Sequence, residues 1–351
     1  MPGGASPDFQ AVASPRIPIG AVPGFRAVTA GLLESRRDRL TRGGHVLETG
    51  VRAAAEGDMP AVRAVARRFG LLGGWRPGAP DFLDAERAFG TLLLAPGRPG
   101  HALGFGGTLR RGELTHLGDL FVLPAHQSSG LGGALLARLL AGDGPRVTFA
   151  SSDHRALGLY VRHGLRPWCP LLYLTGPATG LPAPPVRVTS PGEVAALDAG
   201  VAGGDRRRTL AWYAAVPGVA AYTTGEGYAF VRAIDDEAVI GPAGGTTPQD
   251  SVNAVLGALA ATATPGPAPS STAPSSTAPS STAPSSTATP GTAPGSATPG
   301  TAKIAVPGTH PLVPVLVAAG WRIGDLDTLM ADDAALGLIR PDRYVPHPDL
   351  G

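Results

Sequence analysis

The sequence predicts an α/β protein with two tandem mixed-sheet domains, and two observations carry this prediction. Residues 51–174 follow the order strand, helix, three strands, helix, strand, helix, strand, and residues 185–330 repeat that order in a weaker form. The length of 351 residues is enough for about two domains. Two copies of one order indicate a duplication, and similar halves often pack around a pseudo-twofold axis.

Changes in composition mark the ends of the predicted domains. The chain contains 50 glycines and 37 prolines, about a quarter of its residues, so part of it must be linker. We predict a disordered N-terminal arm over residues 1–44, a first domain over 46–180, a second domain over 185–335 and a C-terminal tail over 336–351.

The second domain is predicted to be interrupted by a disordered insertion over residues 262–302. This segment contains only Pro, Ser, Thr, Ala and Gly, and it repeats Pro-Ser-Ser-Thr-Ala four times from Pro269. Without charged, aromatic or branched aliphatic side chains, it buries too little apolar surface to offset the entropy of ordering. A folded domain tolerates such an insertion, because loop closure costs only about 0.6 kcal/mol more for each doubling of length.

The first domain is predicted to open with a strand at residues 51–54 and a helix that Asp58 caps. One face of that helix is apolar, and it consists of Val62, Val65, Ala66 and Phe69. Three apolar runs separated by turn residues predict an antiparallel meander over residues 91–95, 101–109 and 113–122. A helix, a strand, a helix and a strand follow over residues 130–140, 147–150, 156–163 and 166–174.

The second domain repeats these elements. We predict its opening strand at residues 185–188, a helix that begins at Ser190 with a capping-box Glu193, and three strands at 219–224, 228–234 and 238–240. The next helix is predicted to be capped by Asp250, and its apolar face consists of Val252, Val255, Leu256 and Leu259. A strand, a helix and a strand pair follow at residues 303–306, 312–319 and 321–330.

Charge and cysteine content exclude several classes of protein. The 29 basic and 27 acidic residues are mixed along the chain and give a net charge of +2, so we expect neither nucleic acid nor a membrane as partner. The single cysteine, Cys169, excludes an intramolecular disulfide and a multi-cysteine zinc site, and we predict a buried thiol. No apolar run approaches the roughly 18 to 20 residues of a membrane span, and residues 1–20 do not resemble a secretory signal, so we expect a cytoplasmic protein.

The most informative stretch runs from Leu120 to Ala134. A strand ends near Pro124, a turn follows, and a helix opens with glycines at positions 130, 132 and 133. Unpaired N–H groups at a helix N-terminus carry partial positive charge and suit a phosphate or pyrophosphate. A P-loop would require Gly-Lys-Ser or Gly-Lys-Thr, and a dinucleotide fold would require Gly-x-Gly-x-x-Gly after its first strand; the stretch contains neither.

The pattern Gln-x-x-Gly-x-Gly at residues 127–132, after a Val-x-Pro strand end, resembles the acetyl-coenzyme A loop of the GNAT acetyltransferase superfamily. Residues 153–167 are similar to the family's Asn-x-x-Ala-x-x-Leu-Tyr-x-x-x-Gly-Phe segment, with Tyr160 at the tyrosine position. The resemblance covers residues 51–174 well and 185–330 more faintly. It therefore implies two tandem GNAT-like domains.

The resemblance implies an N-acetyltransferase that moves an acetyl group from acetyl-CoA, its co-substrate, directly to the amine of a small molecule or peptide, without a metal. The fourth strand of the family bulges where a backbone N–H meets the thioester carbonyl, and this position falls near Phe121 and Val122. Asp153 departs from the family's asparagine. The implied CoA-binding residues are Phe121, Val122, Gln127, Ser128, Ser129, Gly130, Leu131, Gly132, Gly133 and Asp153.

Two side chains are the candidate catalytic residues. Tyr160 matches the family tyrosine that protonates the sulfur of coenzyme A, although a tyrosine in a core would fit the sequence as well. His116 lies six residues before Val122, where the family often carries a carboxylate, and a neutral imidazole can accept the proton of the amine. Strand alternation puts His116 on the face of Leu120 and Val122, and Asp119 on the other face.

The second domain lacks the loop. Residues 240–250 contain no Gln-x-x-Gly-x-Gly, and no tyrosine follows the helix at 312–319 in the expected place. We interpret the second domain as a degenerate acetyltransferase-like repeat that completes the substrate cleft or supports the first domain. Two other functions stay open: a non-catalytic acyl-CoA sensor, and a scaffold that does not bind coenzyme A. The sequence does not determine the amine or the oligomeric state.

Overall fold

The structure, a computed structural model, describes residues 50–263 and 299–351. The predicted arm over residues 1–44 and most of the predicted insertion over 262–302 lie outside the described residues. The two ends of that insertion are described, and they belong to regular elements. Thr262 lies in the last turn of a helix, and Thr301 begins a strand.

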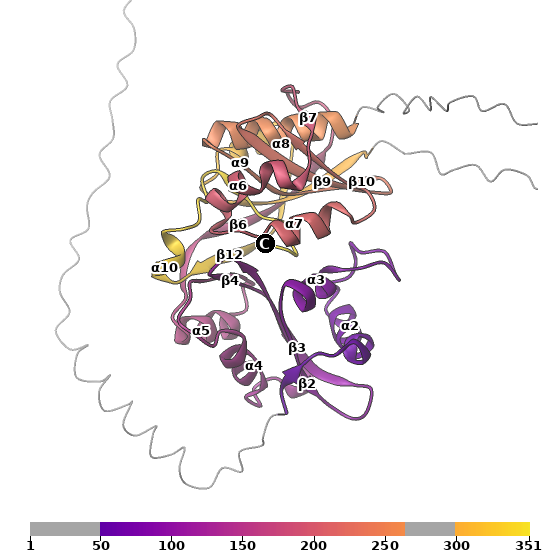
Figure 1. The fold of residues 1–351 in the computed structure, drawn as a ribbon, viewed down its shortest axis with the longest axis vertical. Coiled ribbons are helices and arrows are strands. Elements are labelled where there is room, and N and C mark those ends of the chain that lie inside the picture. The colour runs from indigo at the N-terminus through magenta and orange to yellow at the C-terminus, as the bar shows by residue number, and fades with distance from the viewer. Residues whose placement is uncertain (1–49, 264–298) are drawn as a thin grey trace, which may run out of the picture. The chain divides into compact units, whose positions relative to one another are not determined.

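The described residues form one mixed sheet of 13 strands, which confirms the α/β fold class (Figure 1). Its strands are β1 (Arg52–Ala53), β2 (Gly90–Pro96), β3 (Ala102–Arg111), β4 (Leu114–Val122), β5 (Arg146–Ala150), β6 (Arg166–Pro177), β7 (Arg187–Val188), β8 (Val219–Thr223), β9 (Gly227–Ile234), β10 (Glu237–Gly245), β11 (Thr301–Pro307), β12 (Arg322–Ala331) and β13 (Tyr344–Val345). The spatial order is β1-β2-β3-β4-β5-β12-β6-β11-β10-β9-β8-β7, and β13 pairs with β10. Within each half a meander leads to one parallel pair, β4 with β5 and β10 with β11.

The helices cover both faces of the sheet. They are α2 (Met59–Arg68), α3 (Phe82–Phe89), α4 (Leu131–Leu139), α5 (His154–Arg162), α6 (Pro191–Ala202), α7 (Arg207–Ala214), α8 (Pro248–Ala263), α9 (Leu312–Ala318) and α10 (Asp333–Leu336), with 3-10 turns η1 (Glu56–Asp58) and η2 (Pro124–His126). The predicted apolar faces of α2 and α8 are confirmed, since Val62, Val65, Val252 and Val255 are buried. In the first half, α2 and α3 pack against one face of the sheet, and α4 packs its leucines against the other.

Three helices, α3, α7 and the short α10, were not predicted. Asp58 occupies the predicted N-cap position of α2, but its side chain has a different role, and the start of α8 was misassigned. The Asp58 side chain does not cap α2 but accepts from the Ala55 N–H and pairs with Arg52. Asp250 lies inside the first turn of α8, where it and Thr247 form the reciprocal pair of a capping box.

The two halves exchange their last strands. β12, the last long strand of the second half, lies between β5 and β6 of the first half. In the same way β6 lies between β12 and β11. Because each half needs a strand of the other to complete its part of the sheet, the two repeats form one continuous structure. The strand pair predicted at residues 321–330 is wrong, because β12 is a single strand of the exchanged pair.

Residues 336–351, which we expected to be a tail, pack into the interior. Tyr344 and Val345 form β13 against β10, and His347 and Leu350 are buried. Figure 1 shows the C-terminal residue in the middle of the molecule, beside α7. This segment therefore reaches the same region as β4 and β12.

Candidate functional site

The site begins where β4 and β5 separate. The two strands pair in parallel only from Thr115 to Leu117, although β4 continues to Val122. At Gly118 the pairing of β4 with β3 shifts by one residue, and this bulge bends β4 away from β5. Gly118 suits the bulge, since a Cβ there would lie 2.6 Å from Glu86 Oε1. The result is a gap in the sheet beyond Leu117.

Backbone N–H groups of β4 point into this gap. The N–H of Leu123 donates to the Leu103 oxygen of the β3 side at 2.9 Å. Because N–H directions alternate along a strand, those of Leu120 and Val122 turn to the opposite side, toward the gap. The bulge that we expected near Phe121 and Val122 lies instead at Gly118.

The bulge also overturns the predicted faces of β4. One extra residue shifts the side-chain alternation, so Leu117, Leu120 and Val122 all pack on the face covered by α4. His116 and Asp119 lie on the opposite face. The prediction that His116 shares a face with Leu120 and Val122 was wrong, because simple alternation takes no account of a bulge.

The turn after β4 exposes backbone N–H groups. Gln127 Nε2 donates to the Val122 oxygen at 3.0 Å, and Ser129 Oγ donates to the His126 oxygen at 2.6 Å, so side chains hold the turn from within. Ser128 and Gly130 have φ angles of 63° and 91°. Among the described residues, no acceptor bonds the N–H groups from Ser128 to Gly133.

These free N–H groups lie at the N-terminus of α4. A Cβ added at Gly130 or Gly133 would meet no atom of residues 50–263 or 299–351 within 4 Å, so this part of the chain leaves the backbone open to a ligand. The partial positive charge of the helix end favours an anion there. The seven predicted loop residues, 127–133, thus form one continuous turn directly after β4, and their role in binding an anion stays a prediction.

A cavity of about 250 Å³ lies in the gap. It is lined by Leu71 and Phe82; by His116, Gly118, Asp119, Leu120 and Phe121 of β4; by Phe149, Ser151, Ala156 and Tyr160; and by Tyr173, Asp327, Pro348 and Asp349. Asp327 belongs to β12 and Asp349 to the C-terminal segment, so the second half completes the wall of this cavity.

Tyr160 is a wall residue whose hydroxyl is free. The side chain on α5 is 7% exposed, and the hydroxyl forms no hydrogen bond with any described residue. Burial raises the pKa of Tyr160, and the carboxylates of Asp119, Asp327 and Asp153 raise it further. The hydroxyl therefore keeps its proton at neutral pH and is available as a donor.

His116 lies in the same wall but has the wrong electrostatics for a strong base. Its ring is 2% exposed and packs 4.9 Å from the ring of Phe149, and neither nitrogen has a hydrogen-bond partner. Burial lowers the pKa of His116 well below its usual value, and Arg111 and Arg206 lower it further. At neutral pH the imidazole is uncharged and a weak proton acceptor.

Glu86 and Asp119 form a pair of carboxyl groups near the bulge in β4. Glu86 of α3 is fully buried above Gly107 and Gly118, where any side chain at either glycine would collide with its carboxyl group. Neither oxygen of Glu86 forms a hydrogen bond of good geometry with a described residue. Burial and the nearby Asp119 raise the pKa of Glu86 well above its usual value.

Asp119 has the properties expected of a proton acceptor. Burial raises the pKa of Asp119 to about 7, against the opposing effect of the neighbouring Glu86. The sequence held a signal for Glu86 that the analysis missed. Asp81 and Asp84 have capping-box spacing, and Glu86 falls four residues after Phe82 on the apolar stripe of the helix that follows.

The two remaining candidates behave differently. Asp153 caps α5 by accepting from the Arg155 N–H at 2.8 Å, and the Arg155 guanidinium holds the pKa of Asp153 at about 2. Its contact with coenzyme A stays a prediction. Cys169 is 7% exposed and burial raises its pKa, which confirms a buried thiol.

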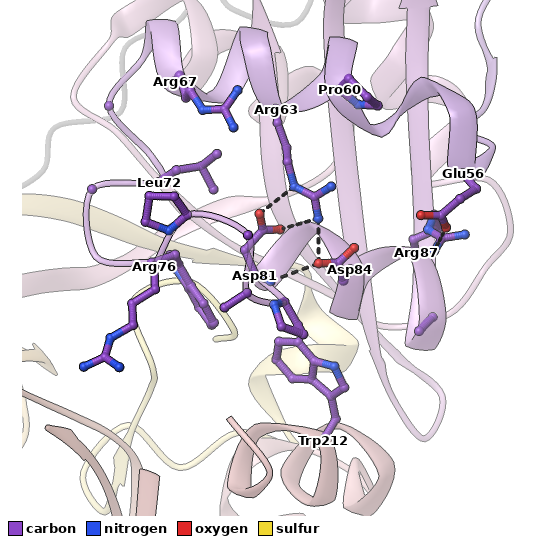
Figure 2. A pocket seen from close by; sticks show the side chains of 18 residues that line it. Glu56, Pro60, Arg63, Arg67, Leu72, Arg76, Asp81, Asp84, Arg87 and Trp212 are labelled. Carbon is purple, nitrogen blue, oxygen red and sulfur yellow. Dashed lines mark hydrogen bonds and ion pairs between the residues drawn. The ribbon is translucent and has the colours of Figure 1, made fainter. Parts of the chain in front are cut away.

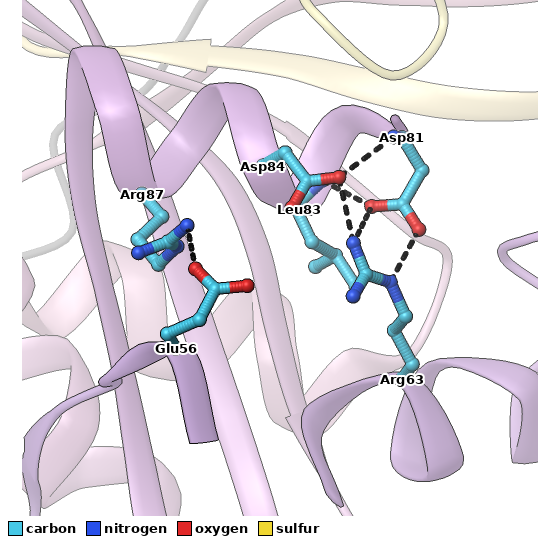
Figure 3. A network of polar contacts seen from close by, with 6 residues as sticks. All are labelled: Glu56, Arg63, Asp81, Leu83, Asp84 and Arg87. Atoms are coloured by element: carbon cyan, nitrogen blue, oxygen red, sulfur yellow. Dashed lines mark hydrogen bonds and ion pairs between the residues drawn. The ribbon is translucent and has the colours of Figure 1, made fainter. Parts of the chain in front are cut away.

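A wider hollow of about 940 Å³ lies outside this cavity, between α2, α3 and Trp212 of α7 (Figure 2). Five of its charged side chains, Glu56, Arg63, Asp81, Asp84 and Arg87, pair with one another, and the exposed Arg67 and Arg76 also line it. Arg63 donates to Asp81 at 2.7 Å and to Asp84 at 2.6 Å, and Arg87 pairs with Glu56 (Figure 3). We attribute to this network a structural role, because it ties α2 to the start of α3 and leaves no buried charge without a partner.

Over residues 50–263 and 299–351, no group of three or more His, Cys, Asp or Glu side chains is arranged to hold a metal ion. No helix in those ranges is long and apolar enough to cross a membrane.

Comparisons with known proteins agree with this geometry. Residues 72–165 match the model of the Acetyltransferase (GNAT) family. A putative acetyltransferase from Pyrococcus horikoshii is similar in structure, with a TM-score of 0.56 and 16% identity over 86% of this chain and 95% of that chain. At that identity the likeness concerns the fold alone.

Two further structures match with TM-scores below 0.5. They are a GCN5-related N-acetyltransferase from Sphaerobacter thermophilus (0.46, 14% identity, 80% of this chain and 94% of that chain) and a tandem GNAT protein from the clavulanic acid biosynthesis pathway (0.48, 16%, 81% and 98%). No curated protein matched the sequence.

Proposed function

Because this chain is a member of the GNAT superfamily through the domain at residues 72–165, we propose that it transfers an acetyl group from acetyl-CoA to an amine. The observation that carries the proposal is that β4 lines the cavity with Tyr160 in its wall and then leads directly into the turn from Ser128 to Gly133, whose N–H groups are free among the described residues. The anion site and the proton donor are thus on the two sides of one gap in the sheet.

We expect acetyl-CoA to bind along this gap, with its pyrophosphate at the turn after β4 and its thioester beside β4. The pyrophosphate would accept from the N–H groups of the turn at Ser128 to Gly133, where the helix dipole favours it. The thioester would then lie along the unpaired edge of β4, where the N–H groups of Leu120 and Val122 can polarise its carbonyl oxygen. Phe121 contacts the rings of Phe69 and Phe105 at 5.0 and 5.8 Å, which fixes the edge that carries these donors.

We assign the proton acceptor to Asp119 in place of His116. An ammonium substrate must lose a proton before its nitrogen can attack, and a base with a pKa near the working pH does this best. The raised pKa of Asp119, about 7, meets this requirement, whereas the imidazole of His116 is held neutral by burial. Glu86 is then a positioning residue, because its carboxyl group contacts Asp119 and not the substrate.

The two protons that leave the nitrogen can be followed through the reaction. Asp119 takes the first from the ammonium, and the neutral nitrogen attacks the thioester carbon to form a tetrahedral adduct. The C–S bond then breaks, the C–N bond remains, and Tyr160 donates its hydroxyl proton to the departing sulfur. The second nitrogen proton, lost as the amide forms, restores Tyr160 directly or through water. The first proton passes from Asp119 to solvent.

The test separates this function from its two rivals. Calorimetry with acetyl-CoA should show binding, and release of free thiol should follow when an amine is added. A scaffold protein would show no binding. An acyl-CoA sensor would bind acetyl-CoA but release no thiol with any amine, and that result would overturn the enzymatic proposal.

A further inference from the structure

The charge of the cavity between β4 and β5 is unbalanced. Asp119, Asp327 and Asp349 line it, and no lysine or arginine of the described chain does. Three guanidinium groups pack behind it. Arg111 donates to the Ala202 oxygen at 2.9 Å, and its Nε and Nη2 have no partner among the described residues. Arg206 pairs with Asp198 at 2.9 Å, and Arg232 donates to the Gly74 oxygen at 2.7 Å while it lies over the ring of Trp75.

The partners of these carboxyl groups are neutral. Tyr173 donates to Asp327 at 2.8 Å, and the indole of Trp75 donates to Asp349 at 2.8 Å. A neutral donor satisfies one lone pair but leaves the charge of a buried carboxylate uncompensated, which is unfavourable. A cation in the cavity would remove that penalty.

Other wall groups also have no partner. His116 is 2% exposed, and both of its ring nitrogens lack a hydrogen bond. The Tyr160 hydroxyl, in a side chain 7% exposed, is likewise unbonded among the described residues. The His116 ring nitrogens and the Tyr160 hydroxyl can therefore form hydrogen bonds with the polar end of a ligand. The rest of the wall is apolar and largely aromatic, with Phe82, Phe121 and Phe149.

We propose that the acceptor bound in this cavity is a compact primary amine that enters as the ammonium ion, has an apolar or aromatic body, and carries no carboxylate or phosphate. The proposal rests on the proposed acetyl transfer and names its substrate class. A volume of about 250 Å³ equals that of about eight water molecules at roughly 30 Å³ each, which suits an amine of this kind. An anionic group would face three aspartates without a basic side chain.

The first experiment compares three amines of similar size with saturating acetyl-CoA. They are 2-phenylethylamine, L-phenylalaninamide, which adds a neutral amide, and L-phenylalanine, which adds a carboxylate. We expect kcat/KM for L-phenylalanine to be at least tenfold below that for L-phenylalaninamide after both values are corrected for the different basicity of the two amines, because the carboxylate then adds a negative charge to a molecule of the same size. Equal values, or faster turnover of L-phenylalanine, would overturn the proposal.

The second experiment changes the wall. Asp327→Asn keeps the shape and can still accept from Tyr173, so we expect KM for 2-phenylethylamine to rise at least tenfold, with kcat and the Kd of acetyl-CoA within threefold. Asp325→Asn is the matched control, because this exposed carboxylate lies on the same strand and lines no part of the cavity. If both variants behave like the unchanged protein, the cation site is not at Asp327 and the proposal falls.

A binding measurement separates failure of this proposal from failure of the proposed function. Calorimetry of 2-phenylethylamine with the CoA-loaded protein, in buffers of different ionisation enthalpy, should show binding with proton release. The groups able to release the proton are the carboxyl groups whose pKa is raised, Asp119, Glu86, Asp327 and Asp349. His116, Tyr160 and Tyr173 also face the cavity, and Arg111, Arg206 and Arg232 lie behind it. Acetyl-CoA binding without amine binding overturns the substrate class alone. Absence of acetyl-CoA binding overturns the proposed function.

Discussion

The two halves have the same order of strands, yet only the first half has an open gap beside its central strand. Both central strands are irregular at a similar place, β4 between Leu117 and Asp119 and β10 between Ile240 and Ala243. In the first half the gap beyond the bulge holds the cavity. In the second half β13 pairs with β10 there, from Ala243 to Gly244. The C-terminal segment thus occupies one potential site and lines the other.

The helices that follow the two central strands also differ: the N-terminus of α4 is open, and that of α8 is closed by protein contacts. The N-terminus of α4 leaves its N–H groups free, whereas at α8 the Asp250 carboxylate accepts from the Thr247 N–H at 3.0 Å. A Cβ at Gly245 would collide with the backbone of Ser251, so the backbone approach there is already closed. A bulge and a helix are therefore not sufficient for a site, because the gap and the helix end must also stay free of protein partners.

Removal of the proposed proton acceptor, Asp119, should abolish most of the activity that distinguishes the first half from the second. Asp119→Asn keeps the size of the side chain but takes no proton, so we expect turnover to fall by about 10² to 10⁴ with acetyl-CoA affinity within a few-fold. Asp119 must be ionised to act, so kcat/KM of the unchanged protein should rise with pH through about 7. An Asn variant that keeps this rise would remove Asp119 from the mechanism.

Tyr160→Phe tests the donor on the other side of the gap. The ring packing is kept and the hydroxyl is lost, so turnover should fall by about 10² or more while acetyl-CoA still binds. A tyrosine with only a packing role would change turnover little. Thiol release and the melting temperature, measured on the same preparation, distinguish the two outcomes.

Gly132→Val tests the open helix end. A bulky side chain at the start of α4 should obstruct the pyrophosphate, and we expect the Kd of acetyl-CoA to rise at least tenfold, or about 1.4 kcal/mol. Gly200→Val, in α6 of the second half, is the control, because a Cβ there meets no described atom within 4 Å and one at Gly132 meets only Val122 and Leu159, at 3.9 and 4.0 Å. Equal Kd values for the two folded variants would contradict the assignment of the turn.

Glu86→Gln tests whether the buried carboxyl group near the cavity lowers the stability of the protein. Because its pKa is raised, Glu86 keeps a proton in the folded protein, whereas in the unfolded chain it loses that proton above about pH 4 to 5. The free energy of unfolding therefore falls as the pH rises. Gln has no such proton, and the variant should be more stable than the unchanged protein at pH 8, by about 1 kcal/mol or more. Urea unfolding at pH 4 and pH 8 measures this; a difference that does not grow with pH would contradict it.

The smallest effect is expected at the closed helix end of the second half. Thr247→Ala removes one partner of the capping pair, and the free energy of unfolding should fall by about 1 kcal/mol. Acetyl-CoA affinity should stay unchanged, because Thr247 neither lines the cavity nor belongs to the turn that we propose binds it. A change in Kd would show that the halves are less different than the geometry indicates.

Local patterns of the sequence predicted much of the fold and part of the site. Helical spacing identified α2, α4, α5 and α8, and apolar runs identified most strands, because these signals depend on neighbours along the chain. The turn at Gln127 to Gly133 was found in the same way. Helix α3 was missed, although its capping box was present, because a charged Glu86 interrupts its short apolar stripe.

What the sequence by itself determined is the repeat of one element order, the glycine turn and the position of Tyr160 on a short helix, since each is encoded within a few consecutive residues. Only the tertiary structure decided the exchange of β6 and β12, the bulge at Gly118, and the meeting of Asp119 with Glu86, Asp327 and Asp349. These depend on which strands pair and in which register. A shift of one residue moves every following side chain to the other face, and no local period records it.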